Sequence, residues 1–203
     1  MDSKKPLEET YNKRFFCRRY KLHWRAVPIC DALWKLWNFQ SVVDVGCATG
    51  DIVKEFEERG LDSWGVEGSS DAEEYIVCSN FKIADLRDPN TMFDRRFDLC
   101  LCLEVAEHIE EEFVDIFVDH LTSLSDIVVL SAAPPGQDGV GHVNCQPPIY
   151  WHRKFKERDY QKNSIATDLL KYNLSPWQNK PGIKAYYHNL IVFEKGLSNA
   201  RSS

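Results

Sequence analysis

The 203-residue sequence has no apolar run near the ~20 residues that a membrane-spanning helix needs. Its first residues, MDSKKPLEETYNKRFFCRRY, are charged from the start and lack the apolar core of a signal peptide. These absences predict an intracellular, cytoplasmic protein without a membrane partner. Repeats, low-complexity tracts and Gly/Ser linkers are missing too, and the length suits one domain with one hydrophobic core. We therefore place no domain boundary within residues 1–203.

A disulfide framework is also missing. The seven cysteines are an odd number, and Cys47, Cys100 and Cys102 fall in segments with the pattern of buried strands. Cys100 and Cys102 would lie on one face of a strand, where two thiols could in principle be metal ligands. No second cysteine pair lies nearby, so core packing is the favoured interpretation.

Basic residues are scarce in the middle of the chain. Residues 31–150 contain 24 Asp/Glu and seven Lys/Arg, whereas residues 1–30 and 151–203 are net basic. An acidic body is not typical of a general nucleic-acid binder. The basic ends either form a groove for an anionic acceptor or are solvated helix faces.

Strand and helix patterns alternate along most of the chain. Residues 11–37 carry aromatic and aliphatic side chains at helical spacing, which predicts one or two helices with a break near Pro28. Strands are expected at residues 41–45, 63–68, 81–86, 97–104, 126–135 and 188–195, and helices at residues 51–60, 110–124 and 147–160. Such alternation predicts βαβ units and a mainly parallel sheet. Residues 167–189 match no expected element and are treated as an insertion before the last strand.

The three-glycine pattern of dinucleotide sites is absent from the first strand-to-helix turn. VVDVGCATGD has only Gly46 and Gly50, separated by three residues. Backbone N–H groups and the helix dipole at such a turn face a ligand. With no pyrophosphate to bind, a cofactor carrying one carboxylate and one nucleoside fits better, although an ordinary turn has the same pattern.

Acidic residues end the next two expected strands. Glu67 lies 21 residues after Gly46, where a carboxylate accepts hydrogen bonds from ribose hydroxyls. Asp85 ends the third strand, where it would accept from an adenine amino group. Because ligands of parallel sheets bind beyond the carboxyl ends of the strands, these residues predict one nucleoside site.

The segments VVDVGCATG, GVEGS, ADLRDP and FDLCLCLEVAEHI resemble the successive cofactor-binding motifs of class I S-adenosylmethionine-dependent methyltransferases. The resemblance covers roughly residues 41–131. It implies an α/β, Rossmann-like, doubly wound fold: a mainly parallel seven-stranded sheet with helices on both faces and an N-terminal helical segment. It further implies a single methyltransferase domain over residues 1–203, with a helical cap (1–40), a cofactor-binding half (41–131) and an acceptor-side half (132–203).

The same resemblance implies which residues contact S-adenosylmethionine. Ala48 departs from the family pattern, because many members have glycine there, and we expect it to narrow the turn without preventing binding. The implied cofactor-binding residues are Asp44, Gly46, Cys47 and Gly50 at the methionine end with Leu103 beside them, Glu67 at the ribose, and Asp85 with Leu86 at the adenine.

A cluster of titratable residues follows the fourth strand. Glu104, Glu107 and His108 are spaced i, i+3 and i+4, so a helix there would bring them to one face. The loop after the fifth strand supplies His142 at the same edge of the sheet. Carboxylates with imidazoles suit a divalent cation, and the set resembles the Mg²⁺ site of small-RNA 3′-end methyltransferases and that of metal-dependent O-methyltransferases of ubiquinone synthesis.

Two functional interpretations of this cluster stay open, beside a purely structural one. In one, Glu104, Glu107, His108 and His142 hold Mg²⁺ and lower the pKa of an acceptor hydroxyl. In the other no metal is used: His142 or His108 is the general base, with Glu104 as a further catalytic candidate. In the structural interpretation, the carboxylates are residues at the start of a helix that the helix dipole favours, and His108 packs beneath the cofactor.

The leading functional hypothesis is O-methylation of a carbohydrate or polyol hydroxyl, with a small molecule or glycan as acceptor and no indication of an oligomeric state. Gly139 and Gly141 suggest a mobile loop over that acceptor. Asn144, Gln146, Tyr150 and Trp151 are of the types that line sugar sites, although Tyr150 and Trp151 equally suit a helix anchor. The alternatives are an RNA ribose acceptor, which the acidic body disfavours, a small phenolic metabolite, and a non-catalytic cofactor-binding partner protein.

Overall fold

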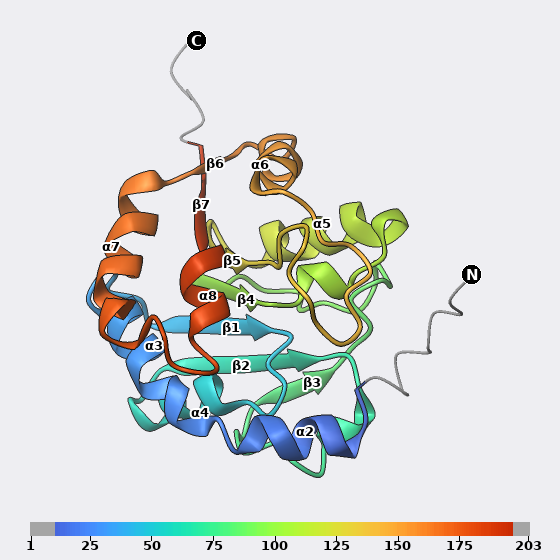
Figure 1. The fold of residues 1–203 in the computed structure, drawn as a ribbon, viewed down its shortest axis with the longest axis vertical. Helices are drawn as coiled ribbons and strands as arrows, with labels where there is room; N and C mark the ends of the chain where they lie inside the picture. Colours follow the sequence, from blue (N-terminus) through green and yellow to red (C-terminus); the bar gives the residue numbers. More distant parts are fainter. Residues whose placement is uncertain (1–10, 197–203) are drawn as a thin grey trace.

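Seven strands form one sheet in the order β3-β2-β1-β4-β5-β7-β6 in the computed structural model, which describes residues 11–196 (Figure 1). β7 runs antiparallel to its neighbours β5 and β6, and the other pairs are parallel. The predicted mainly parallel, doubly wound seven-stranded sheet is therefore confirmed. The strands are β1 (Ser41–Val45), β2 (Asp62–Glu67), β3 (Phe81–Ile83), β4 (Leu99–Leu103), β5 (Ile127–Ser131), β6 (Tyr160–Lys162) and β7 (Ile191–Lys195).

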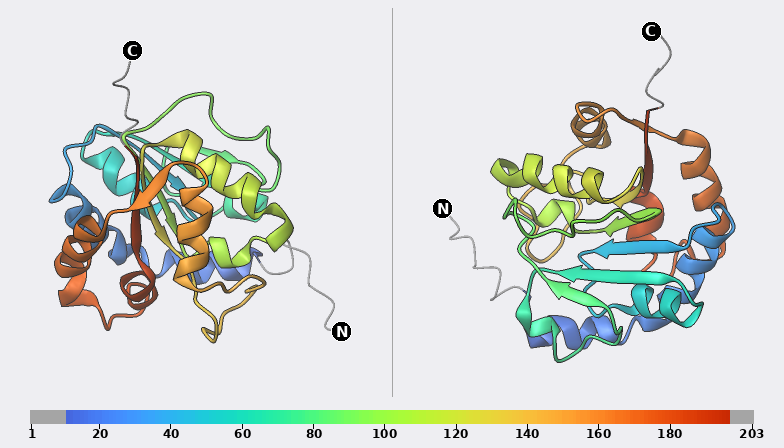
Figure 2. Two further views of the ribbon diagram at one scale, coloured as in Figure 1. Left: turned by 90° about the horizontal axis from the view of Figure 1, so that it is seen from above. Right: turned by 180° about the vertical axis from the view of Figure 1, so that it is seen from behind.

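Helices cover both faces of this sheet, as the views in Figure 2 show. The helices are α2 (Lys13–Tyr20), α3 (Ala26–Trp34), α4 (Asp51–Glu58), α5 (Val114–Leu124), α6 (Pro148–Lys156), α7 (Ser164–Leu174) and α8 (Lys184–Asn189). One hydrophobic cluster joins the sheet to α5 and α6, and a second joins it to α3, α4, α7 and α8. None of the helices in the described residues is long and apolar enough to cross a membrane.

β4 shows how the sequence pattern produces the two layers. Successive strand side chains point to opposite faces of a sheet. Cys100 and Cys102 accordingly pack in the cluster with α5, whereas Leu101 and Leu103 pack in the cluster with α3. Both cysteines are fully buried and free, which confirms their interpretation as core residues.

Three expectations about the elements were wrong. The helix expected over residues 147–160 ends at Lys156, and Tyr160–Lys162 forms β6, a strand too short for an alternating pattern to be visible. Residues 167–189, for which no element was expected, contain most of α7, a 3-10 helix at Ser175–Trp177 and α8, and both α-helices pack on the sheet. Pro28 does not break the N-terminal helices: it lies in the first turn of α3, where its missing N–H would have had no partner.

Candidate active site

A cavity of about 250 Å³ opens at the carboxyl ends of β1, β2 and β4. Most of the residues predicted to bind the cofactor line it, and so do two of the catalytic candidates, Glu104 and His108. Gly50, Glu107 and His142 are not among the lining residues. The predicted cofactor residues that line the cavity are Asp44, Gly46, Cys47, Glu67, Asp85, Leu86 and Leu103.

The glycines shape the turn between β1 and α4. Gly46 has φ +82°, and a Cβ there would lie 2.3 Å from Cγ2 of Val105. Gly50 has φ +75°, and its Cβ would lie 2.4 Å from Sγ of Cys78. Both positions therefore need glycine for conformation and for space. Ala48 adopts φ +53° between them, in the left-handed region that L-residues other than glycine seldom occupy.

Glu67 is held by the backbone around this turn. Its Oε2 accepts a hydrogen bond from Ala48 N at 2.9 Å, and its Oε1 accepts from Gly68 N at 2.8 Å and Ser69 N at 3.1 Å. Burial raises the pKa of Glu67, and these three N–H donors oppose that rise. Since a carboxylate offers about four acceptor positions, Oε2 retains capacity for one further donor from a ligand.

Asp85 is paired with a residue two positions along the chain. Its carboxylate accepts from the backbone N, Nε and Nη2 of Arg87 at 2.8–3.0 Å, which lowers the pKa of Asp85. Arg87 also lies 3.5 Å from the carboxylate of Glu110. Leu86 between them is buried and forms an apolar part of the cavity wall.

The inner end of the cavity holds a buried cation that the sequence did not single out. Arg25 is 4% exposed, and its Nε and Nη1 have no hydrogen-bond partner within residues 11–196. Its guanidinium lies over the ring of Tyr186, 5.5 Å from the centroid. Burial raises the pKa of nearby Asp44 to about 7, and the charge of Arg25 opposes that rise. The sequence offers no signal that separates Arg25 from the other basic residues of the N-terminal segment.

A second group of residues that was not predicted from the sequence lines the cavity and comes from the N-terminal part of the described chain. Tyr11, Phe15 and Arg19 are spaced four residues apart, so they present one face of α2 and the residues before it to the cavity. The Tyr11 hydroxyl is buried and has no hydrogen-bond partner in the described part of the chain. Burial raises its pKa, and the charges of Glu107 and Glu67 add to the rise. The Tyr11 ring meets His108 edge-on at 5.4 Å.

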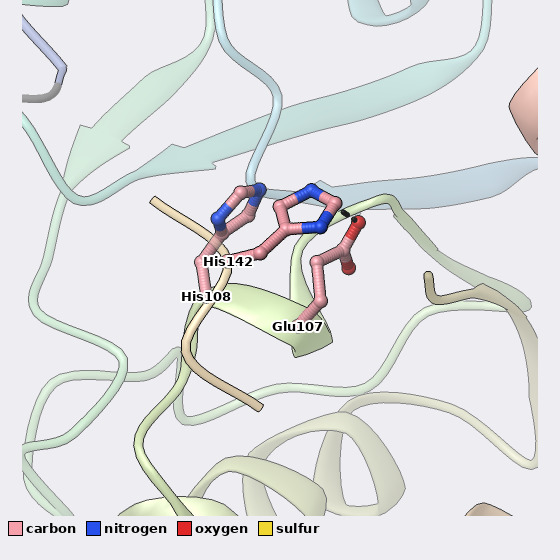
Figure 3. A group of neighbouring side chains, drawn as sticks. All are labelled: Glu107, His108 and His142. Carbon is pink, nitrogen blue, oxygen red and sulfur yellow. Dashed lines mark ion pairs between the residues drawn. The ribbon is translucent and has the colours of Figure 1, made fainter. Parts of the chain in front are cut away.

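Glu107, His108 and His142 form a compact group beside the cavity (Figure 3). One ligand atom from each lies within 4.8 Å of the others, and His142 Nε2 is 3.8 Å from Glu107 Oε1. Glu107 and His108 belong to a short 3-10 helix at Ala106–His108, and the loop after β5 brings in His142. That loop is fixed to the 3-10 helix, because Val143 N and Asn144 N both donate to the Glu107 carbonyl at 2.9 Å.

Hydrogen bonds orient both imidazoles of this group. His108 Nδ1 donates to the Gly141 carbonyl at 3.0 Å, and His142 Nδ1 donates to the Gln137 carbonyl at 3.1 Å. A carbonyl only accepts, so each neutral ring carries its proton on Nδ1 and leaves the Nε2 lone pair free. Burial lowers the pKa of His108 to about 4, which keeps that ring neutral near pH 7.

Glu107 is the carboxyl group beside the two rings. It is fully buried, and neither carboxyl oxygen makes a hydrogen bond of ordinary geometry within the described residues. Burial raises its pKa to about 8, and the negative charge of Glu104 adds to the rise. A buried carboxyl without donors is costly unless a cation or a proton compensates it.

Glu104 does not share a helical face with Glu107 and His108. It has φ +56° and precedes the 3-10 helix, so the expected α-helical spacing does not apply. Its Oε1 accepts from Asn189 Nδ2 and its Oε2 from Gln137 Nε2, both at 3.0 Å. Glu104 accordingly lies outside the three-residue group, though near enough for its charge to act on Glu107.

Comparison with known families decides the identity of this chain. The family described as a methyltransferase domain matches residues 21–161, which is more than half of the chain. The chain belongs to this family. It is an S-adenosylmethionine-dependent methyltransferase, as the four cofactor motifs implied. A search of curated proteins finds no match to this methyltransferase.

Solved structures share the fold of this methyltransferase at low sequence identity. The magnesium protoporphyrin IX methyltransferase of Synechocystis PCC 6803 with bound cofactor is 20% identical, with 71% of this chain and 70% of that chain covered and a TM-score of 0.53. A sugar N-methyltransferase of a Streptoalloteichus species is 16% identical, with 85% and 87% covered and a TM-score of 0.60. An O-methyltransferase family protein of Burkholderia thailandensis is 10% identical, with 97% and 66% covered and a TM-score of 0.60.

Two of the four residues considered for a sugar site are core residues of the methyltransferase. Tyr150 and Trp151 are buried in the core cluster with α5, which favours their alternative interpretation as helix anchors. Gly139 lies so close to His142 that a Cβ would meet its Nε2 at 2.0 Å. The carbonyl of Gly141 accepts the hydrogen bond that orients His108, so Gly139 contacts one imidazole by close packing and Gly141 the other by a backbone hydrogen bond.

Proposed function

We propose that this methyltransferase methylates a hydroxyl of a carbohydrate or similar polyol, assisted by a divalent cation. The observation that supports the proposal is the buried carboxyl of Glu107, which has no hydrogen-bond partner within the described residues and lies beside two histidines whose Nε2 atoms donate no hydrogen bond. An alcohol is a weak nucleophile until it loses its proton, so its methylation needs a base or a metal. A methyl acceptor that is already a good nucleophile would not need this group.

In this proposal the first cavity holds the cofactor in an extended form. Glu67 accepts from a ribose hydroxyl through Oε2, and Asp85 with Leu86 borders the adenine. Arg25 pairs with the methionine carboxylate, because its unpartnered Nε and Nη1 are donors suited to a carboxylate. Asp44 then faces the ammonium group, and Leu103 borders the methionine chain.

The donor set of the Glu107 group fits a divalent cation. One carboxylate and two neutral imidazoles are ligands for a borderline or hard metal, and the Nδ1–H bonds to Gly141 and Gln137 resemble those that orient metal-binding histidines. Glu107, His108 and His142 would hold the ion. When bound, such an ion lowers the pKa of a coordinated hydroxyl.

The protein's own residues would align the acceptor and exclude water. Methyl transfer from a sulfonium is a direct displacement, so the hydroxyl has to approach in line with the carbon–sulfur bond. Tyr11 lies between Glu67 and the Glu107 group, where its unpartnered hydroxyl is available to the acceptor or the cofactor. Among the solved structures that share this fold, one is named a sugar N-methyltransferase and another an O-methyltransferase family protein, so a sugar acceptor and transfer to oxygen each occur separately in these names.

Calorimetric titration tests the proposal in two steps. S-adenosylhomocysteine is titrated first, and Mg²⁺ or Mn²⁺ is then added to the complex. We expect a saturable cation signal that is lost in Glu107→Gln and kept in Glu112→Gln, a matched change at an exposed carboxylate. We also expect EDTA to abolish methyl transfer to polyol acceptors. If the cation titration gives no heat and the enzyme still turns over in EDTA, metal assistance is contradicted and a histidine would be the base.

A further inference from the structure

A second cavity of about 260 Å³ lies at the same edge of the sheet, where α7 and α8 lie beside β7 (Figure 1). It exists because β6 is short. β6 ends at Lys162, so it does not extend along the first residues of β7. There the backbone N–H of Val192 donates to a side chain, Oγ1 of Thr167, at 3.0 Å. Leu130 and Ile191 form part of an apolar floor beneath this space.

The polar groups around this second cavity are mostly donors and cations. Trp151 is 1% exposed, and its Nε1–H is buried without a hydrogen-bond partner in residues 11–196. Nε2 of His152 is also buried and unpartnered. Lys162 and Lys171 complete the set, and Lys171 Nζ donates only to the His188 carbonyl among the described residues, at 3.1 Å.

The two lysines of this set, Lys162 and Lys171, repel each other. Burial lowers the pKa of Lys171, with the positive charge of Lys162 as the next cause, and the carboxylate of Asp168 opposes this less strongly. Burial and the charge of Lys162 also lower the pKa of His152. Positive groups gathered around a partly desolvated space, with one exposed carboxylate among them, create a field that favours a bound anion.

We propose that this second cavity binds an anionic group, a phosphate or a carboxylate, of the methyl acceptor. That the anion belongs to the methyl acceptor rests on the proposed function. That the cavity binds an anion rests on the cavity alone. Trp151 Nε1, Lys162 and Lys171 are the donors, while the apolar floor carries the adjoining part of the molecule. The cavity adjoins the first one through Asn189, which lines the second cavity and donates to Glu104 in the first. A sugar phosphate or a sugar acid therefore fits the acceptor better than a neutral sugar.

The indole N–H of Trp151 provides a direct probe. In ¹H–¹⁵N spectra of the full chain, with its signal assigned from Trp151→Phe, inorganic phosphate and acetate are titrated at constant ionic strength in EDTA. We expect a saturable shift of this signal, with the affinity at least ~10-fold lower in a Lys162→Gln/Lys171→Gln double variant. Lys180→Gln/Lys184→Gln makes the same charge change at exposed positions outside the cavity and should bind as the parent does.

To decide between a sugar phosphate and a sugar acid, the binding of glucose 6-phosphate and of glucuronate is measured, each in comparison with glucose. Tighter binding of the phosphate ester than of inorganic phosphate assigns a sugar phosphate, and tighter binding of glucuronate than of acetate assigns a sugar acid. An unmoved Trp151 signal, or unchanged affinity in the Lys162/Lys171 variant, overturns the anion site. If neither sugar anion binds more tightly than its bare ion, the link to the acceptor is overturned. No cofactor, cation or turnover is involved, so failure of the proposed function leaves these results unaffected.

Discussion

Asn189 Nδ2 donates to Glu104 Oε1 at 3.0 Å, and the two residues line different cavities. The same Nδ2 donates to Gln137 Oε1 at 2.9 Å, while Gln137 Nε2 donates to the other oxygen of Glu104 at 3.0 Å. The three side chains therefore form a closed ring of hydrogen bonds. This ring fixes the orientation of the Glu104 carboxylate, whereas neither carboxyl oxygen of Glu107 has such a side-chain donor within the described residues.

Replacing Glu67 with glutamine should weaken the binding of S-adenosylhomocysteine about 10- to 100-fold. A hydrogen bond to a charged group contributes about 1.5–3 kcal/mol, and the neutral amide loses that charge. Calorimetric titration measures the change. Glu73→Gln, at an exposed carboxylate, is the control and should bind like the parent. Affinity within twofold of the parent in Glu67→Gln would show that the ribose is held elsewhere.

Replacing His142 with alanine should spare cofactor binding and remove methyl transfer. His142 belongs to the Glu107 group and does not line the cofactor cavity. Affinity for S-adenosylhomocysteine should stay within twofold, while transfer of labelled methyl groups and the calorimetric cation signal are both lost. His23→Ala, at an exposed histidine, should leave all three unchanged. Unchanged turnover in His142→Ala would exclude His142 from the chemistry.

Asp44 should make the unliganded protein less stable as pH rises. Its pKa is about 7 in the folded state and 3.8 ordinarily, so between these values the folded state holds a proton that the unfolded state has lost. The free energy of unfolding therefore falls as pH rises from about 4 to 7, by about 4 kcal/mol at ~1.4 kcal/mol per pKa unit.

Asp44→Asn removes this contribution, so relative to the parent the variant should gain stability between pH 5 and pH 8. Urea unfolding at the two pH values measures the difference. Asp138→Asn, at an exposed carboxylate, should keep the parent's pH dependence. An equal slope in Asp44→Asn and the parent would mean that Asp44 is ionised throughout.

Replacing Ala48 with glycine should stabilise the protein by up to ~1 kcal/mol. The left-handed conformation costs an L-residue about 1–2 kcal/mol, and the greater freedom of unfolded glycine offsets roughly 0.5–1 kcal/mol of the gain. Ala185→Gly, inside α8, should instead destabilise by about 1 kcal/mol. Chemical unfolding of both variants measures whether the free energy of unfolding changes in opposite directions. Destabilisation by Ala48→Gly would show that the left-handed conformation of Ala48 is not strained.

The features that the sequence predicted have local signals. Gly46 directly follows β1 and Glu67 ends β2, and parallel strands bring their carboxyl ends to one edge, so their meeting follows from the order of elements. Arg25 and Tyr11 were not predicted, because each is buried only where a distant part of the chain packs over it. The position of Glu104 depends on a backbone angle of φ +56° that its neighbours in sequence do not reveal.

Tyr11, which precedes α2, borders both the cofactor cavity and His108 of the Glu107 group. Ser69 Oγ donates to the Tyr11 carbonyl at 2.8 Å, and Lys13 pairs with Glu74, so polar contacts near the start of α2 hold this part of the chain to the segment after β2. The same Tyr11 ring covers His108. Because one ring borders the cofactor cavity and also covers the imidazole, a shift of Tyr11 would expose both together.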